Sequence, residues 1–167
     1  MIVVRHCEDP NALAAFLFPA CFDDLRRAFP FRLLNPELLV AAIASWDIVE
    51  FFDTEKWVIV GAAAREPNRY VHIYVDSDRR ASWSPHTSLQ AALDVFFSDA
   101  DSLFAAIPLT NRSTISIVRK LGFVQMRTEN GVAFHVITPQ MRKSLTEKHR
   151  RAIRQGSNLR SGKLSAI

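Results

Sequence analysis

Cysteine and long apolar runs are scarce in this sequence, and each shortage excludes a class of protein. The 167 residues include 2 cysteines without a Cys-x-x-Cys spacing, so a disulfide framework is excluded and a reduced, cytoplasmic setting is expected. The longest apolar stretch, residues 12–22, contains Pro19 and is too short to cross a membrane. The first residues lack the basic-then-apolar order of a signal peptide. The 5 histidines show no ligand spacing, so no metal site is predicted.

Positive charge is concentrated at one end of the chain. The formal net charge is +4, but residues 139–167 carry +7 and residues 1–138 carry −3. The pattern predicts a folded domain over residues 1–138 and a basic C-terminal helix with a flexible tail over residues 139–167. With 49% apolar and 23% charged residues, the chain has the composition of a globular protein with a buried core.

Hydrophobic periodicity and turn signals predict an α+β fold of the mixed α/β type. The order is strand, helices, three strands, helix, strand, helix and hairpin. This order predicts a mostly antiparallel twisted sheet of about six to seven strands, flanked by helices, with a βαβ-like crossover. Strands are expected at 2–5, 47–52, 56–64, 69–76, 103–107, 123–127 and 132–137, and helices at 12–18, 21–29, 36–45, from 85 onward, 111–121 and 139–155.

Apolar and polar residues alternate in the segment 69–76. Val71, Ile73 and Val75 are expected to face the core, with His72 and Tyr74 on the opposite, polar side.

The last third of the predicted domain resembles the second half of a GCN5-related N-acetyltransferase (GNAT) domain. The resemblance rests on the strand Leu103–Pro108, then Asn111, then a helix that ends in Leu121-Gly122-Phe123, followed by a hairpin. The element order from residue 1 to residue 137 also matches the family fold. The resemblance implies an acyl-CoA-dependent N-acyltransferase that moves an acetyl group from acetyl-CoA to an unidentified amine, on a small molecule or a protein.

In the GNAT family, a glycine-containing loop between a strand and a helix holds the CoA pyrophosphate through backbone N–H groups. Here the loop reads Arg80-Ala81-Ser82-Trp83-Ser84-Pro85, in which Trp83 and Pro85 stand where the family has glycines. The alternative for Ser84-Pro85 is an ordinary helix cap, and Asn111 either contacts the cofactor or holds the start of its helix. The resemblance places acetyl-CoA against Val75, Arg79, Arg80, Ala81, Ser82, Trp83, Ser84 and Asn111.

His72 and Asp76 are the candidate catalytic residues. A histidine can take the proton of the acceptor amine near neutral pH, although a strand histidine with no chemical role is the alternative. Asp76 either accepts a proton or caps the following loop. Val118 stands where the family often has a tyrosine that protonates the departing thiolate, and valine cannot do so.

A second function stays open: a catalytically weak or inactive GNAT-fold binding or structural protein, such as those associated with bacteriophages. The changed loop and Val118 both favour it. The basic tail would then dock an acidic protein partner or a second copy in a homodimer. The tail has no aromatic residue on which bases could stack, which argues against a nucleic-acid partner.

Overall fold

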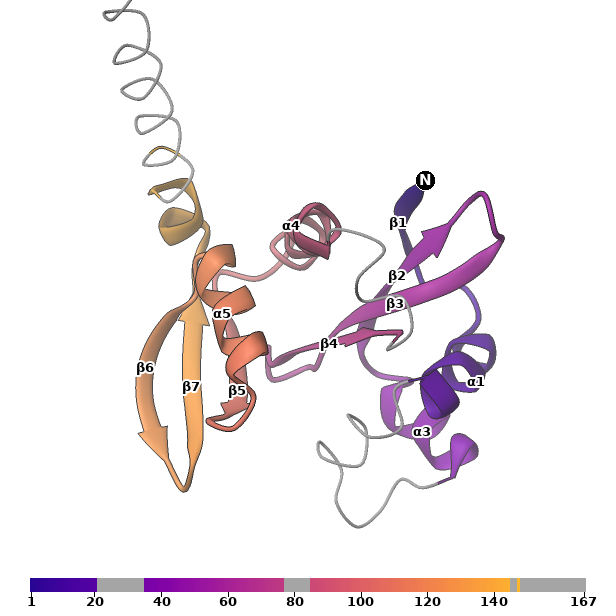
Figure 1. The fold of residues 1–167 in the computed structure, drawn as a ribbon, viewed down its shortest axis with the longest axis horizontal. Helices are drawn as coiled ribbons and strands as arrows, with labels where there is room; N and C mark the ends of the chain where they lie inside the picture. The colour runs from indigo at the N-terminus through magenta and orange to yellow at the C-terminus, as the bar shows by residue number, and fades with distance from the viewer. Residues whose placement is uncertain (21–34, 77–84, 145–146, 148–167) are drawn as a thin grey trace, which may run out of the picture. The chain divides into compact units, whose positions relative to one another are not determined.

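The computed structural model describes residues 1–20, 35–76, 85–144 and 147 (Figure 1). The chain divides into two compact units, Met1–Ala106 and Ile107–Ile167, and each is described by itself. The predicted domain boundary at residue 138 stays a prediction. No helix in the described part is long and apolar enough to span a membrane.

The first unit is built on a four-stranded antiparallel sheet in the order β1-β2-β3-β4. Short polar turns join the last three strands, as the alternation and turn residues predict. One irregularity, between Phe51 and Phe52, shifts the pairing of β2 with β3. The strands are β1 (Ile2–His6), β2 (Asp47–Asp53), β3 (Val58–Arg65) and β4 (Val71–Val75).

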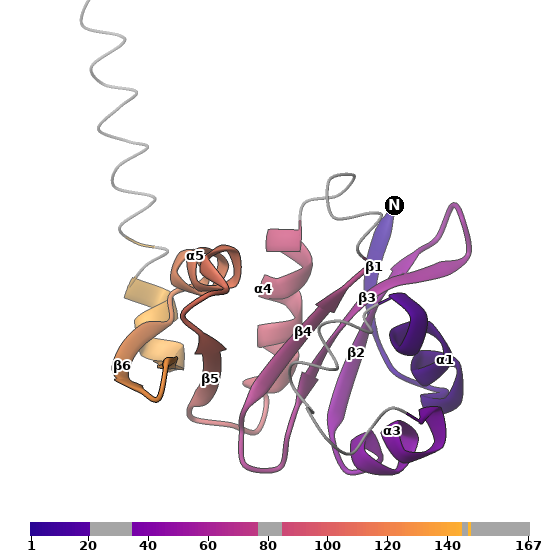
Figure 2. The same ribbon diagram turned by 60° about the horizontal axis from the view of Figure 1, so that its bottom comes forward.

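Helices cover both faces of this sheet (Figures 1 and 2). Helices α1 (Pro10–Ala20) and α3 (Pro36–Ile43) pack on one face, and α4 (Pro85–Phe96) packs on the other. The predicted start at Asn35-Pro36 is confirmed, because Asn35 Oδ1 accepts the backbone N–H of Glu37 at 2.8 Å. The helix predicted from residue 85 onward is also confirmed. It is α4, whose Leu89, Leu93 and Phe96 are buried.

The predicted break of the first helix at Pro19 is wrong. Helix α1 begins earlier, at Pro10, because Asp9 Oδ1 caps it by accepting the N–H groups of Asn11 and Ala12. The helix also includes Pro19, which lies one residue from its end and so removes a single N–H donor without interrupting an interior turn. The predicted helix at residues 21–29 lies outside the described residues.

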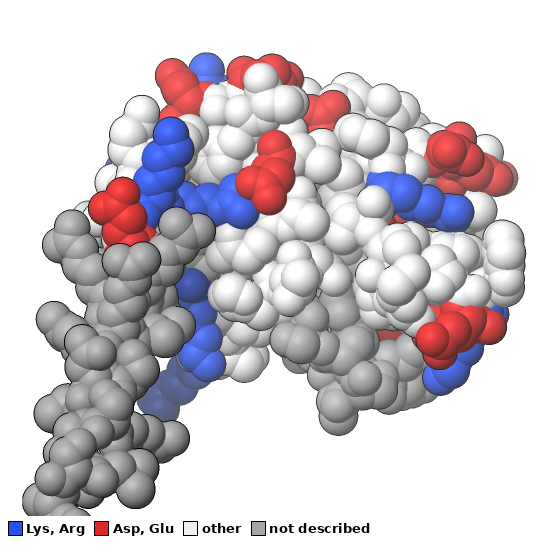
Figure 3. All heavy atoms as spheres, turned by 90° about the horizontal axis from the view of Figure 1, so that it is seen from above, with Lys and Arg blue, Asp and Glu red and all other residues white. Residues whose placement is uncertain are grey.

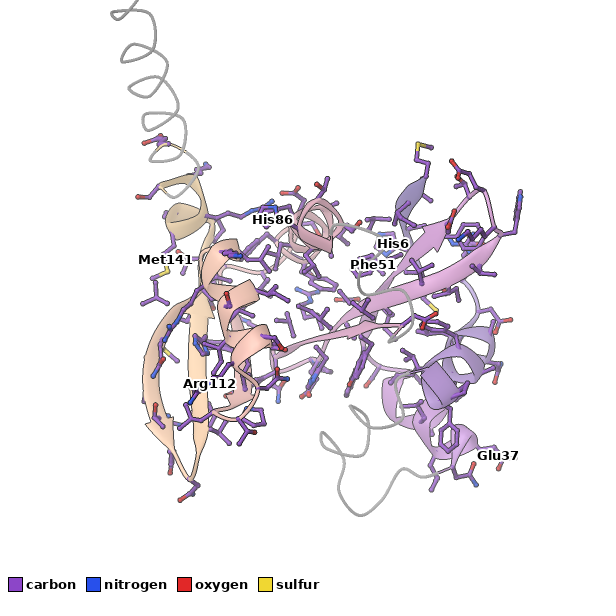
Figure 4. All side chains as sticks on the ribbon, in the orientation of Figure 1. His6, Glu37, Phe51, His86, Arg112 and Met141 are labelled. Carbon is purple, nitrogen blue, oxygen red and sulfur yellow. The ribbon has the colours of Figure 1, made fainter. Side chains whose placement is uncertain are left out.

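The expectation that His72 and Tyr74 face away from the core is also wrong. Tyr74 is 5% exposed and belongs to the hydrophobic cluster that α1 and α3 form on their face of the sheet. Phe51, labelled in Figure 4, is fully buried on the opposite face, toward α4. Because helices pack on both faces of the sheet, the side of β4 that carries Tyr74 is also part of the core.

The second unit holds α5 (Arg112–Leu121) and the antiparallel hairpin of β6 (Val124–Glu129) and β7 (Val132–Ile137). The predicted Asn130-Gly131 turn is confirmed, with φ values of 49° and 76°. Gly122 ends α5 at φ 103°, in the left-handed conformation that its position predicted. Residues 139–144 are helical, and the remainder of the predicted helix up to residue 155 lies largely outside the described residues.

The mixed α/β class is confirmed, but the single sheet of six to seven strands is not. The described strands form a sheet of four and a second sheet of three, with the order β5-β7-β6. Strand β5 is Leu103–Pro108. Between β4 and β5 the structure gives one parallel bridge, Tyr70 to Phe104, instead of a continuous ladder.

Candidate active site

The edge of β4 that faces away from β3 is the first component of the candidate site. The backbone groups of Asp76 and Tyr70 point toward β3. The N–H of Asp76 donates to the carbonyl of Val60 at 3.0 Å, and the carbonyl of Tyr70 accepts the N–H of Glu66 at 2.8 Å. Backbone groups alternate in direction along a strand, so the groups of Val71, Ile73 and Val75 point to the other edge.

That edge is occupied at its beginning. The N–H of Phe104 donates to the carbonyl of Arg69 at 3.0 Å, next to the Tyr70–Phe104 bridge. Beyond the bridge, β4 and β5 belong to different sheets, so no described strand pairs with this edge of β4 near Val75. An extended ligand with amide groups could form hydrogen bonds there, as an added strand does.

The loop predicted to hold the CoA pyrophosphate lies outside the described residues. This applies to Arg79, Arg80, Ala81, Ser82, Trp83 and Ser84. Its two ends are described: β4 stops at Val75, and α4 begins at Pro85. A strand and a helix therefore flank these residues, as the resemblance requires.

His72 lies in a cluster of aromatic and acidic side chains on the α1/α3 face of the sheet. Its Nε2 is 2.5 Å from Oε1 of Glu66, and both side chains are largely buried, at 25% and 23% exposed. The ring of Trp46 stacks on the imidazole with 5.2 Å between centroids and 13° between planes. Tyr74 stacks at 6.4 Å and 10°.

Asp76 is not part of this cluster. It follows β4 and lies four residues after His72, which is about 13 Å along an extended strand. The two candidate catalytic residues, one in β4 and one just after it, are therefore not brought together.

Glu66 and Trp46 were not predicted as site residues. Glu66 lies in the turn between β3 and β4. The register of the β3–β4 hairpin could have indicated Glu66. Because Arg65 pairs with Val71, Glu66 lies just beyond that pair and close to His72. Trp46 comes just before β2 and contacts His72 through tertiary packing, for which the sequence carries no local signal.

Asn111 caps α5. Its Oδ1 accepts the backbone N–H of Thr114 at 3.2 Å and the hydroxyl of Ser113 at 3.0 Å. Of the two roles that the sequence left open, holding the helix start is therefore observed, while cofactor contact stays a prediction. Val118, further along α5, is 2% exposed and offers no proton.

A buried carboxylate, Glu50, lies beside the neighbouring strand β1. It is 2% exposed, and the Nε of Arg5 donates to it at 3.0 Å. Burial, with the adjacent Glu50, raises the pKa of the Cys7 thiol to about 12. Because the thiolate is the nucleophilic form of cysteine, Cys7 is a poor nucleophile.

Charges elsewhere on the described surface are mixed in sign. Figure 3 shows basic and acidic side chains lying next to one another on the face it draws. Arg65, for example, donates to both Asp47 and Asp99, and Arg69 donates to Asp101. Among the residues that the structure describes, no group of His, Cys, Asp and Glu side chains could hold a metal ion.

Comparisons with known proteins identify the fold. In sequence, the chain matches no protein-family profile and no curated protein. In structure, it is similar over most of its length to solved N-acetyltransferases. The chain has the GNAT fold, so the resemblance predicted from the sequence is confirmed at the level of the fold.

Three solved structures illustrate the likeness. A protein from Acinetobacter baylyi ADP1, assigned as an acetyltransferase, has a TM-score of 0.70 at 17% identity over 83% of this chain and 93% of its own. Spermidine N-acetyltransferase from Vibrio cholerae, in complex with CoA and spermine, has a TM-score of 0.66 at 13% identity over 84% and 97%. A dodecameric structure of that enzyme gives 0.62 at 13% over 82% and 93%.

Proposed function

We propose that the protein is an acyl-CoA-dependent N-acyltransferase that moves an acetyl group from acetyl-CoA to an amine. The observation that carries the proposal is the edge of β4 near Val75, which no described strand covers, with helix α4 beginning ten residues further along at Pro85. The GNAT fold supports it, and so do solved structures with this fold, one of which is an N-acetyltransferase in complex with CoA and spermine.

Acetyl-CoA would bind along β4 and at the start of α4. The outward backbone groups of Val75 would take the amides of the pantetheine arm as an added strand. The N-terminal end of α4, with Arg79 and Arg80 before it, would hold the pyrophosphate. The first unit carries no excess of positive charge, so attraction of the phosphates would be local to these groups.

The acyl transfer needs an amine nitrogen without a proton on its lone pair. That nitrogen attacks the thioester carbonyl carbon, a C–N bond forms and the C–S bond breaks. His72 would accept the proton that the nitrogen loses, and the departing thiolate would take a proton from water. Asp76 lies too far from His72 to act on the same proton. It would instead cap the segment that follows β4. The identity of the acceptor stays open.

The experiment is calorimetric titration of the full chain with acetyl-CoA, followed by release of free CoA thiol in the presence of a panel of small amines and lysine peptides. Arg80→Ala should weaken binding, because it removes one charged donor to phosphate. The matched control is Arg127→Ala, whose side chain is 63% exposed on β6 and pairs with Glu129. Absence of any heat with acetyl-CoA at millimolar concentration would refute the proposal.

A second candidate is a GNAT-fold binding protein without catalysis, which the burial of Val118 at the position of the family tyrosine favours. It would bind acetyl-CoA without releasing thiol for any amine. Docking of an acidic partner or a second copy through the basic residues after 139 belongs to this candidate and stays a prediction, as does a phage origin.

A further inference from the structure

We infer that Glu66 is a positioning residue that fixes His72 as a base acting through its Nδ1 atom, with Trp46 holding the plane of the ring. The inference rests on the proposed function for its chemical purpose. The arrangement itself is a property of the fold and can be tested without any substrate.

The contact with Glu66 determines which nitrogen of His72 carries the proton. An ionised carboxylate only accepts hydrogen bonds, so at 2.5 Å the Nε2 atom must be the donor. A neutral imidazole has one N–H, which leaves the lone pair on Nδ1. Among the described residues, no hydrogen bond to Nδ1 is found, and that nitrogen is available to accept a proton.

The ring stack limits how the imidazole can turn. Trp46 lies on the imidazole at 5.2 Å with a 13° tilt, and Tyr74 follows at 6.4 Å with a 10° tilt. A partial rotation about the Cβ–Cγ bond would break the stack, and a half turn, which keeps the ring in the stack, would break the Glu66 contact.

Three separate segments contribute to the cluster, and all lie in the first unit. Trp46 precedes β2, Glu66 follows β3, and His72 is the second residue of β4. The residue paired with His72 on β3 is Ala64, so the groups that the structure places against the ring are Trp46, Glu66 and Tyr74.

The cluster therefore has the parts of an oriented base. The acceptor nitrogen loses its proton to Nδ1, the positive charge that forms is shared with Glu66 through Nε2–H, and the proton later passes to water. In this arrangement Glu66 touches no substrate and acts only through His72.

The first test is nitrogen-15 NMR of the histidine side chains in the full chain at a pH where they are neutral. We expect His72 in the Nε2–H tautomer. In Glu66→Gln that preference should be lost, since an amide both donates and accepts. In the control Glu8→Gln, an exposed residue on the loop after β1, it should persist. An Nδ1–H tautomer in the native chain, or no change in Glu66→Gln, would overturn the inference.

The second test uses acetyl-CoA and an amine that the native chain acetylates. Glu66→Gln should lower kcat by roughly 10²-fold and leave KM for acetyl-CoA unchanged, while Glu66→Asp should recover part of the loss. The double variant Glu66→Gln/His72→Gln should be no slower than His72→Gln alone. Full activity of His72→Gln would overturn the inference. A native chain that acetylates nothing would refute the proposed function and leave the NMR result to decide the positioning.

Discussion

Substitution of Gly61 by alanine should destabilise the first unit, because strand β3 has no room for a side chain at this position. A Cβ atom there would lie 2.7 Å from the carbonyl oxygen of Tyr74, 3.0 Å from Cδ2 of Phe51 and 3.4 Å from Cα of Val75. Two of these atoms belong to the backbone of β4, and Phe51 is fully buried. The strain can therefore be relieved only by moving β4.

The expected cost is that of overpacking, about 1–3 kcal/mol. For a chain of this size, each kcal/mol lowers the melting temperature by roughly 2–4 °C, so a fall of about 2–12 °C is expected. Thermal unfolding followed by circular dichroism measures this fall, and urea unfolding gives the free energy independently.

The control is Gly131→Asn at the tip of the β6–β7 hairpin. A Cβ at Gly131 meets no atom within 4 Å, so Gly131→Asn adds no packing clash, and the strain of its φ of 76° is smallest for asparagine among residues with a side chain. Its melting temperature should therefore fall less than that of Gly61→Ala. If Gly61→Ala were as stable as the control, the close approach of β3 to β4 would not exist in solution and the reasoning would fail.

Three further predictions concern a cap, an ion pair and a thiol. Asn111→Ala should cost about 1 kcal/mol in urea unfolding, since the N–H of Thr114 loses its acceptor, and Asn111→Asp should recover most of it. The hydrogen bond from Arg65 lowers the pKa of Asp99 below its ordinary value of 3.8. The stability that the Arg65–Asp99 pair contributes is therefore present above that pH and is lost as the pH falls below it. In acid titrations followed by circular dichroism, Arg65→Met should lose less stability over that range than the native chain. With its pKa raised to about 12, the Cys7 thiol should react slowly with iodoacetamide at pH 8. Glu50→Gln should speed this alkylation, which mass spectrometry follows. Fast reaction in the native chain would contradict the burial of this thiol.

Elements whose ends carry local signals were predicted well from the sequence. Asn35-Pro36 starts a helix, Gly122 ends one and Asn130-Gly131 turns a hairpin, each through the dihedral angles or hydrogen bonds of a few adjacent residues. Pro19 was interpreted by the same kind of rule and was wrong, because a proline in the last turn of a helix removes little.

Features that depend on pairing between distant segments were not predictable in this way. The separation of the strands into two sheets is decided by which edges meet, and periodicity reports only which residues share a face. For the same reason His72 was found as a candidate, while its partners Glu66 and Trp46 were not. The residues of the loop after Val75 remain predictions from the sequence.

Strand β3 has a further consequence for how activity could be adjusted. From Gly61 to Ala64 it holds four residues no larger than alanine, between helical layers on both faces. Neither glycine nor alanine has a side-chain torsion, so this stretch cannot absorb a size change in a neighbour by selecting another rotamer. The remaining response is a shift of backbone that is hydrogen-bonded to β4. Substitutions on α1 or α4 that face β3 would thus shift the backbone of β4 and with it His72, so the proposed acyl transfer could be altered from positions that contact no substrate.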